Sequence, residues 1–262
     1  MLDLPRAARL ALWGTTALHG DASAADAARA VQRDDEPHTV TGDVTVATTL
    51  VGLLDDCRAA GATSLRTVLP AAGDPQGLTG PPEATVAATD AGEAAVVATA
   101  RATLALVPDV TVFGSHLEPG AMVDWRVLAV NPLRPPTESL ADADRALREA
   151  LRAATEALAQ LDVSRWREDA ADRIVAVRDG GLLPDVLPPG TDPRVARVVA
   201  TAARVRAIVE LALEDDGAAV TGWEATRRAA ALRDVDAVAR RCLAAALDAQ
   251  TGGQAGRPST VE

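Results

Sequence analysis

The chain has 262 residues, enough for one large domain or two modest ones, and its formal net charge is −11. This charge argues against bulk attraction to nucleic acid or to an anionic membrane, because both depend on pairing with negative groups. All 26 basic residues are Arg, and the chain has no Lys and no Tyr. Walker A, Schiff-base and pyridoxal-phosphate chemistry, which need Lys, are therefore excluded, and we expect no cofactor.

The first 61 residues have the pattern of three helices. Two short helices are predicted from Pro5 to His19 and from Ala24 to Arg33, and a third from Val46 to Ala60 before Gly61. The start resembles a signal peptide, but Asp3 and the polar residues inside its apolar run favour a helix. No run approaches the roughly 20 apolar residues of a membrane span. We expect a cytoplasmic protein that does not bind membranes.

The middle of the chain has strand patterns separated by turn residues. Strands are predicted over Ser64–Leu69, Ala94–Thr99, Val110–Phe113 and Met122–Val130. Pro119 and Gly120 fit the two central positions of a type II turn, which favours an antiparallel hairpin. Trp125 alternates with apolar neighbours along the last strand, so its ring should face the core.

Proline pairs after residue 130 mark a predicted domain boundary, and the pattern beyond them is helical. Apolar stripes predict four helices: a long one from Leu140, a shorter one around Trp166, and two more before a polar tail. The expected fold class is α+β, with N-terminal helices and a small mixed or antiparallel sheet followed by a C-terminal helical bundle. The expected domains are residues 1–133 (mixed α/β) and 137–250 (bundle), with a disordered tail over 251–262.

Two segments of the front domain contain candidate ligand-binding residues. The irregular loop 73–83 provides Asp74 and Glu83, and the hairpin provides His116, Glu118 and Asp124. His116 and Glu118 are two positions apart, so both would face one side of a strand, as two metal ligands or an acid/base pair must. No third ligand is evident, so we expect no metal. The alternatives are solvent-facing hairpin residues and a surface loop made rigid by proline.

The helix from Pro193 to Asp216 has Arg residues toward its start and carboxylates at its end, which opposes the helix dipole. We expect these charges to be balanced by the following helix, which Thr221 and Glu224 would cap. The predicted structural network consists of Arg206, Glu210, Glu214, Arg227 and Arg228. The alternative is a site for a polar ligand or a partner. Cys57 and Cys242 lie on apolar helix faces and are expected to be buried and reduced.

Several short segments are distinctive: Ala11-Leu12-Trp13-Gly14, Leu69-Pro70 with Gly73-Asp74-Pro75, Glu118-Pro119-Gly120 with Trp125-Arg126, and the run Arg204 to Glu210 with Asp215-Asp216-Gly217. With these segments the chain resembles an uncharacterised protein family of high-GC Gram-positive (actinobacterial) bacteria, over most of its length. The resemblance implies a cytoplasmic bacterial setting and no particular reaction, ligand or partner.

The residues favour a non-catalytic protein that acts through a protein partner or as a homo-oligomer. The alternative is a small-ligand-binding protein or enzyme that uses loop 73–83 and the hairpin around residues 116–124.

Overall fold

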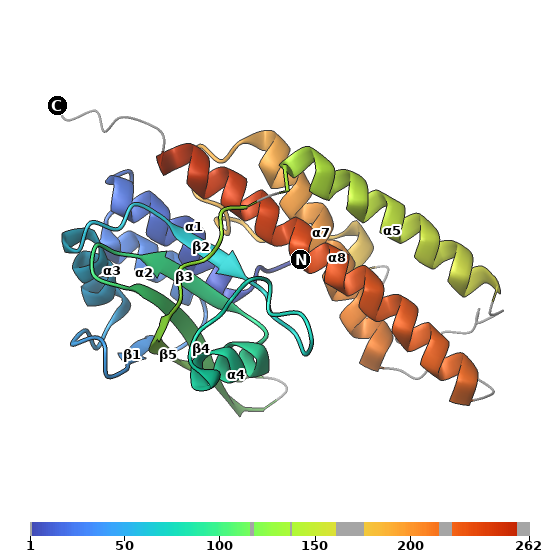
Figure 1. Cartoon of the computed structure of the whole chain (residues 1–262), viewed down its shortest axis with the longest axis horizontal. Helices are drawn as coiled ribbons and strands as arrows, with labels where there is room; N and C mark the ends of the chain where they lie inside the picture. Colours follow the sequence, from blue (N-terminus) through green and yellow to red (C-terminus); the bar gives the residue numbers. More distant parts are fainter. Residues whose placement is uncertain (1, 116–117, 137, 161–175, 215–221, 256–262) are drawn as a thin grey trace. The chain divides into compact units, whose positions relative to one another are not determined.

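The computed structural model describes residues 2–115, 118–136, 138–160, 176–214 and 222–255, which belong to two compact units (Figure 1). The N-terminal unit contains Leu4–Pro136, Asp185–Thr191 and the chain from Leu247 onward. The C-terminal unit contains Met1–Asp3, Thr137–Pro184 and Asp192–Ala246. The fold is α+β, as predicted: N-terminal helices, a five-stranded mixed sheet and C-terminal helices.

Three helices begin the N-terminal unit: α1 (Arg6–His19), α2 (Ala24–Gln32) and α3 (Leu50–Ala59). Ser23 caps α2 by accepting a hydrogen bond from the backbone of Asp26, and Thr49 caps α3 in the same way. The cap at Thr49 starts α3 at Leu50, so the predicted start at Val46 was wrong. Val46 lies in the preceding loop, exposed to solvent.

The sheet has the order β1-β5-β4-β3-β2. Its strands are β1 (Thr39–Thr41), β2 (Leu65–Val68), β3 (Ala94–Ala98), β4 (Thr103–Gly114) and β5 (Pro119–Val130). The short strand β1 pairs parallel with β5, and the other three pairings are antiparallel. The sequence did not predict β1, and it predicted only the last part of β4.

Helices cover both faces of the sheet. On one face, α1, α2 and α3 pack over a core that contains Leu54, Leu106 and Trp125. Trp125 is fully buried, which confirms its predicted orientation. On the other face, α4 (Pro82–Ala91) packs through Ala84 and Ala88 on a second core.

The loop predicted for residues 73–83 is irregular over residues 73–81, and only its last two residues belong to helix α4. Pro82 occupies a first-turn position, where the missing N–H costs no helical hydrogen bond. The sequence did not predict this helix, because the segment that leads into it is rich in Gly and Pro. The segment before α4 is held by packing: Leu78 is buried, and a Cβ on Gly80 would lie 3.1 Å from the Cα of Val130.

The described C-terminal helices are α5 (Leu140–Gln160), α7 (Pro193–Glu214) and α8 (Gly222–Ala255). The predicted helix around Trp166 lies outside the described residues. Helix α8 runs through Thr251, whose buried hydroxyl bonds the carbonyl of Leu247, so residues 251–255 are helical where the sequence predicted disorder. Within the described ranges, no helix has the length and apolar character needed to cross a membrane.

Candidate functional site at the β4–β5 hairpin

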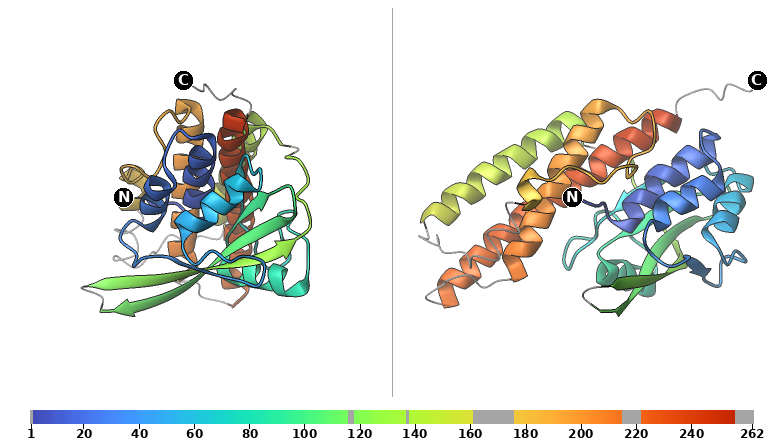
Figure 2. Two further views of the ribbon diagram at one scale, coloured as in Figure 1. Left: turned by 90° about the vertical axis from the view of Figure 1, so that its left-hand side faces the viewer. Right: turned by 180° about the vertical axis from the view of Figure 1, so that it is seen from behind.

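Strands β4 and β5 form a long hairpin that extends beyond the rest of the sheet. The two strands pair from Thr103 and Val130 to Gly114 and Pro119, whereas β3 pairs with β4 only as far as Leu106. We call residues 108–114 and 119–122 the outer hairpin. Figure 2 shows it projecting away from the helices of the N-terminal unit.

One edge of the outer hairpin is open. At its end, Ser115 and Glu118 exchange two backbone hydrogen bonds of 3.2 Å. Because bonded pairs alternate along an antiparallel ladder, Thr111 and Phe113 bond toward β5, and the backbones of Pro108, Val110 and Val112 face away from it. In the part of the chain that the structure describes, no strand pairs with these three residues on that side. We call them the open edge of β4.

The outer hairpin exposes large apolar side chains. The exposed fractions are 73% for Val112, 42% for Phe113 and 51% for Met122. The Phe113 ring lies across the opposite glycine, because a Cβ added to Gly120 would come within 2.6 Å of it. Val112 lies on one face of the ribbon, and Phe113 and Met122 lie on the other.

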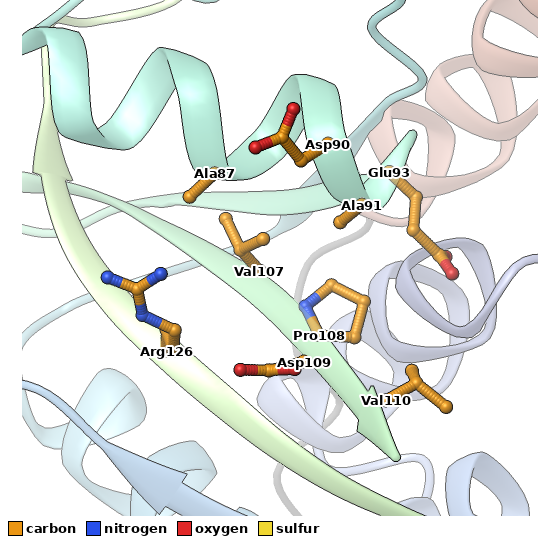
Figure 3. A pocket seen from close by; sticks show the side chains of 9 residues that line it. All are labelled: Ala87, Asp90, Ala91, Glu93, Val107, Pro108, Asp109, Val110 and Arg126. Atoms are coloured by element: carbon orange, nitrogen blue, oxygen red, sulfur yellow. The ribbon is translucent and has the colours of Figure 1, made fainter. Parts of the chain in front are cut away.

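A cavity of about 410 Å³ lies beside β4, where the end of α4 faces the hairpin (Figure 3). Its lining residues are Ala87, Asp90, Ala91, Glu93, Val107, Pro108, Asp109, Val110 and Arg126. Three of these carry carboxylates and one carries a guanidinium, so we call it the acidic cavity. It borders the open edge, because Pro108 and Val110 belong to both.

The carboxylates of the acidic cavity differ in how they are held. Glu93 accepts a 2.6 Å hydrogen bond from the backbone of Ala7 in the first turn of α1, and Arg126 binds Glu83 at 2.9 Å. Asp90 and Asp109 make no ion pair with any residue that the structure describes. Asp90 also lies in the last turn of α4, where the helix dipole is already negative. The cavity is therefore electronegative and suited to a cation.

The structure brings two of the predicted ligand-binding residues to this side of the sheet. Glu83 binds Arg126, and Asp124 lies two residues from Arg126 on the same strand face. Asp124 is held by β1, because it accepts hydrogen bonds from the hydroxyls of Thr39 (2.7 Å) and Thr41.

The other predicted residues do not join them. Asp74 follows β2, at the other edge of the sheet, and Glu118 belongs to the hairpin turn. His116 lies outside the described residues. The sequence analysis did not select Asp90, Glu93 or Asp109. Asp90 lies at the end of α4, a helix that the sequence did not predict, and Glu93 and Asp109 carry no sequence signal of their own. Among the residues described, no three His, Cys, Asp or Glu side chains are grouped so as to hold a metal ion.

A buried polar chain lies on the other face of the sheet. The indole N–H of Trp125 donates to Nδ1 of His38 at 3.1 Å, so His38 carries its proton on Nε2, 3.2 Å from Oδ2 of Asp35. Arg6 donates two 2.7 Å hydrogen bonds to Asp35. His38 lies in the loop directly before β1, where its side chain is buried. Both ring nitrogens are occupied, which leaves His38 a structural role.

Burial changes the pKa values of His38 and Asp35 in this row of hydrogen-bonded side chains. It lowers the pKa of His38 by more than the hydrogen bond to Asp35 raises it. Burial alone would raise the pKa of Asp35, but the hydrogen bonds and charges of Arg6 and His38 together outweigh it and lower that pKa.

The charges between α7 and α8 are centred on Asp236, a residue that sequence reasoning did not select. Asp236 contacts Arg206 at 3.6 Å and Arg240 at 2.9 Å, while Arg228 donates to the carbonyl of Ala212 at 2.9 Å. Glu210 is exposed and makes no ion pair with a described residue. Arg227 and Arg228 are described residues, so the structure does not contain the predicted pairing of Glu210 with either of them. The side chain of Glu214 lies outside the described residues, so its pairing with Arg227 or Arg228 stays a prediction.

Two family models match consecutive parts of the chain. The model described as Rv1486c-like protein, N-terminal domain, matches residues 7–140, and the model described as Rv1486c-like protein, C-terminal domain, matches residues 141–244. Searches of curated proteins and of solved structures find no match. A family named after a mycobacterial protein agrees with the actinobacterial resemblance noted in the sequence.

Proposed function

The chain belongs to the family of Rv1486c-like proteins. We propose that it is a non-catalytic protein that binds another protein chain through its outer hairpin. The observation that carries the proposal is the exposure of Val112, Phe113 and Met122 on a ribbon with an open edge. Single exposed apolar residues are ordinary. A group of them beside unpaired backbone is a site of association, because such an edge readily accepts another strand.

The cysteines and the buried histidine support a non-catalytic role. Burial raises the pKa of the Cys57 thiol to about 11 and that of Cys242 to about 12, so neither is a thiolate at neutral pH. His38 uses both ring nitrogens within the fold. Neither cysteine nor His38 therefore offers an activated nucleophile or a free base.

Photo-crosslinking tests the proposal. A photoreactive residue replaces Val112 in the full chain, in cells of the source organism, and the matched control carries it at Val86, which is 56% exposed on α4. We expect a discrete adduct from position 112 that disappears in the Phe113→Ser/Met122→Ser variant. Adduct mass distinguishes a second copy from a different partner. Equal adducts from both positions, or none, would contradict the proposal.

A second candidate function, small-ligand binding, is favoured by a larger and more apolar cavity beside α3. This cavity has a volume of about 570 Å³, within the range of small-molecule sites. Leu53, Cys57 and Leu104 line it together with Ala102. Thermal shifts with a library of apolar compounds test this candidate. Stabilisation that is lost when Ala102→Trp fills the cavity would support it.

A further inference from the structure

Resting on the proposed function, we infer that the partner of the outer hairpin is an extended segment in which apolar and basic side chains alternate. This segment pairs with the open edge of β4 and places a basic side chain at the acidic cavity. Three features of the N-terminal unit lead to this partner: the backbone of the edge, the difference between the two faces of the hairpin, and the charges of the cavity.

The backbone of the open edge is suited to strand addition. Val110 and Val112 each present an N–H and a C=O away from β5, on the side where β3 has ended. An extended peptide that satisfies these groups adds a strand to the sheet. Pro108 has no N–H, so it limits pairing at the inner end of the edge.

The two faces of the hairpin differ beside this edge. On the face covered by α1 to α3, Val110 and Val112 present apolar side chains next to the edge. On the opposite face, Asp109 and the acidic cavity flank it. Because successive side chains of a strand point to opposite faces, an added strand meets Val110 and Val112 on one face. On the other face it meets Asp109 and the acidic cavity at the inner end of the edge, and Thr111 and Phe113 farther out.

The charges of the cavity select a basic side chain. Asp90 and Asp109 have no ion-pair partner among the described residues, and Asp90 lies at the negative end of α4. The one guanidinium of the lining, Arg126, is already paired with Glu83. An Arg or Lys of the partner would be held by these carboxylates, in keeping with the net charge of −11.

Fluorescence anisotropy with labelled octapeptides tests the inference on the full chain. The probes are an alternating Val-Arg peptide, its Val-Glu counterpart, and a block isomer with four Val followed by four Arg. We expect the alternating peptide to bind, the block isomer to bind more weakly and the Val-Glu peptide not to bind. Added salt should weaken binding, because the cavity is partly exposed.

Variants of the protein distinguish the contribution of backbone pairing to peptide binding from the contribution of the carboxylates. Val110→Pro removes an edge N–H that faces away from β5, so it should abolish peptide binding while circular dichroism and the melting temperature show a folded chain. Val112→Pro is the second variant of this kind. Asp109→Asn and Asp90→Asn should each weaken binding by about two- to fivefold, the size of an exposed ion pair. Asp21→Asn, outside the cavity, is the matched control and should bind like the wild type.

The outcomes distinguish the two proposals. Equal binding of the alternating peptide and the block isomer, or wild-type binding by Val110→Pro, overturns the inference of strand addition. If no octapeptide binds while the adduct from position 112 persists, the inference is overturned and the hairpin still binds a partner. If the adduct itself is absent, the proposed function has failed.

Discussion

At the scale of single residues, the N-terminal unit is organised around Trp125 and the polar chain attached to it. Apolar neighbours at two-residue spacing predicted its burial, and the structure shows the ring fully enclosed. The sequence could not predict that His38, 87 positions away, receives the indole N–H, because only the parallel pairing of β1 with β5 brings them together.

Replacing Trp125 with Ala should lower the free energy of unfolding by about 3–5 kcal/mol, the usual loss for a large buried aromatic side chain. Urea unfolding checks this value. Val86→Ala, on the exposed side of α4, is the control and should change little. A loss for Trp125→Ala below about 1 kcal/mol would show that the ring does not support the core.

The lowered pKa of His38 predicts a loss of stability in mild acid. The unfolded chain takes up a proton on this histidine near pH 6.5, and the folded chain does so only at lower pH. Stability should therefore fall as the pH drops below about 6.5, well before Asp35, with its lowered pKa, contributes. Urea unfolding at pH 7.5 and 5.5 measures this, and His38→Gln should remove most of the difference. A variant with the wild-type slope would exclude His38 as its cause.

The two thiols should react slowly in the folded protein, because burial raises both pKa values. A colorimetric thiol reagent at pH 8 should label Cys57 and Cys242 at a rate that increases sharply on unfolding. Cys57→Ser and Cys242→Ser variants assign the two signals. Rapid labelling of either residue in native protein would contradict its burial.

At the scale of elements, the sequence predicted those defined by local patterns and missed those that depend on pairing. The sequence predicted an antiparallel hairpin, but its turn was placed wrongly: Pro119 and Gly120 lie in β5 opposite Gly114 and Phe113, and the hairpin closes at Ser115 and Glu118. Strand β4 was also predicted too short. In the structure, Pro108 occupies a position whose backbone faces away from β5, so it removes no hydrogen bond from the ladder. Asp109 joins the acidic cavity only because β4 and α4 meet there.

One ion pair joins the end of α8 to strand β2. Arg66 binds Asp248 at 2.7 Å, and burial raises the pKa of Asp248 by more than Arg66 lowers it. Arg66→Met should destabilise the fold by about 2 kcal/mol at pH 7, less than the roughly 3–5 kcal/mol of a fully buried pair because Arg66 is partly exposed. Chemical unfolding of Arg66→Met and Arg66→Met/Asp248→Leu tests this, and the double variant should recover part of the loss.

The stability loss caused by Arg66→Met should depend on pH. A carboxyl with a raised pKa stabilises the fold while protonated, and this stability is lost as the pH rises. The loss caused by Arg66→Met should therefore be smaller near pH 4, close to the ordinary Asp pKa of about 3.9, than at pH 7. An equal loss at both values would mean that Asp248 does not depend on Arg66.

At the scale of the whole molecule, the α+β class and the helical C-terminal part followed from sequence periodicity, and the site did not. The predicted ligand residues were chosen for their chemistry, yet Asp124 holds β1 and Glu83 neutralises Arg126. The candidate site combines an open strand edge and exposed apolar side chains with Asp90 and Asp109, which form no ion pair with a described residue. The edge of β4 is open because the pairing with β3 ends at Leu106. The position of this end does not follow from the local sequence pattern.

Hydrogen exchange of the Val110 and Val112 amides, followed by NMR, tests the central claim most directly. In the free protein these two amides should exchange quickly, while those of Thr111 and Phe113, which bond toward β5, are protected. A saturating amount of the alternating Val-Arg peptide should slow exchange at Val110 and Val112 and leave the other two unchanged. Protection of Val110 and Val112 in the free protein, or no change on saturation, would contradict an open edge that binds a partner strand.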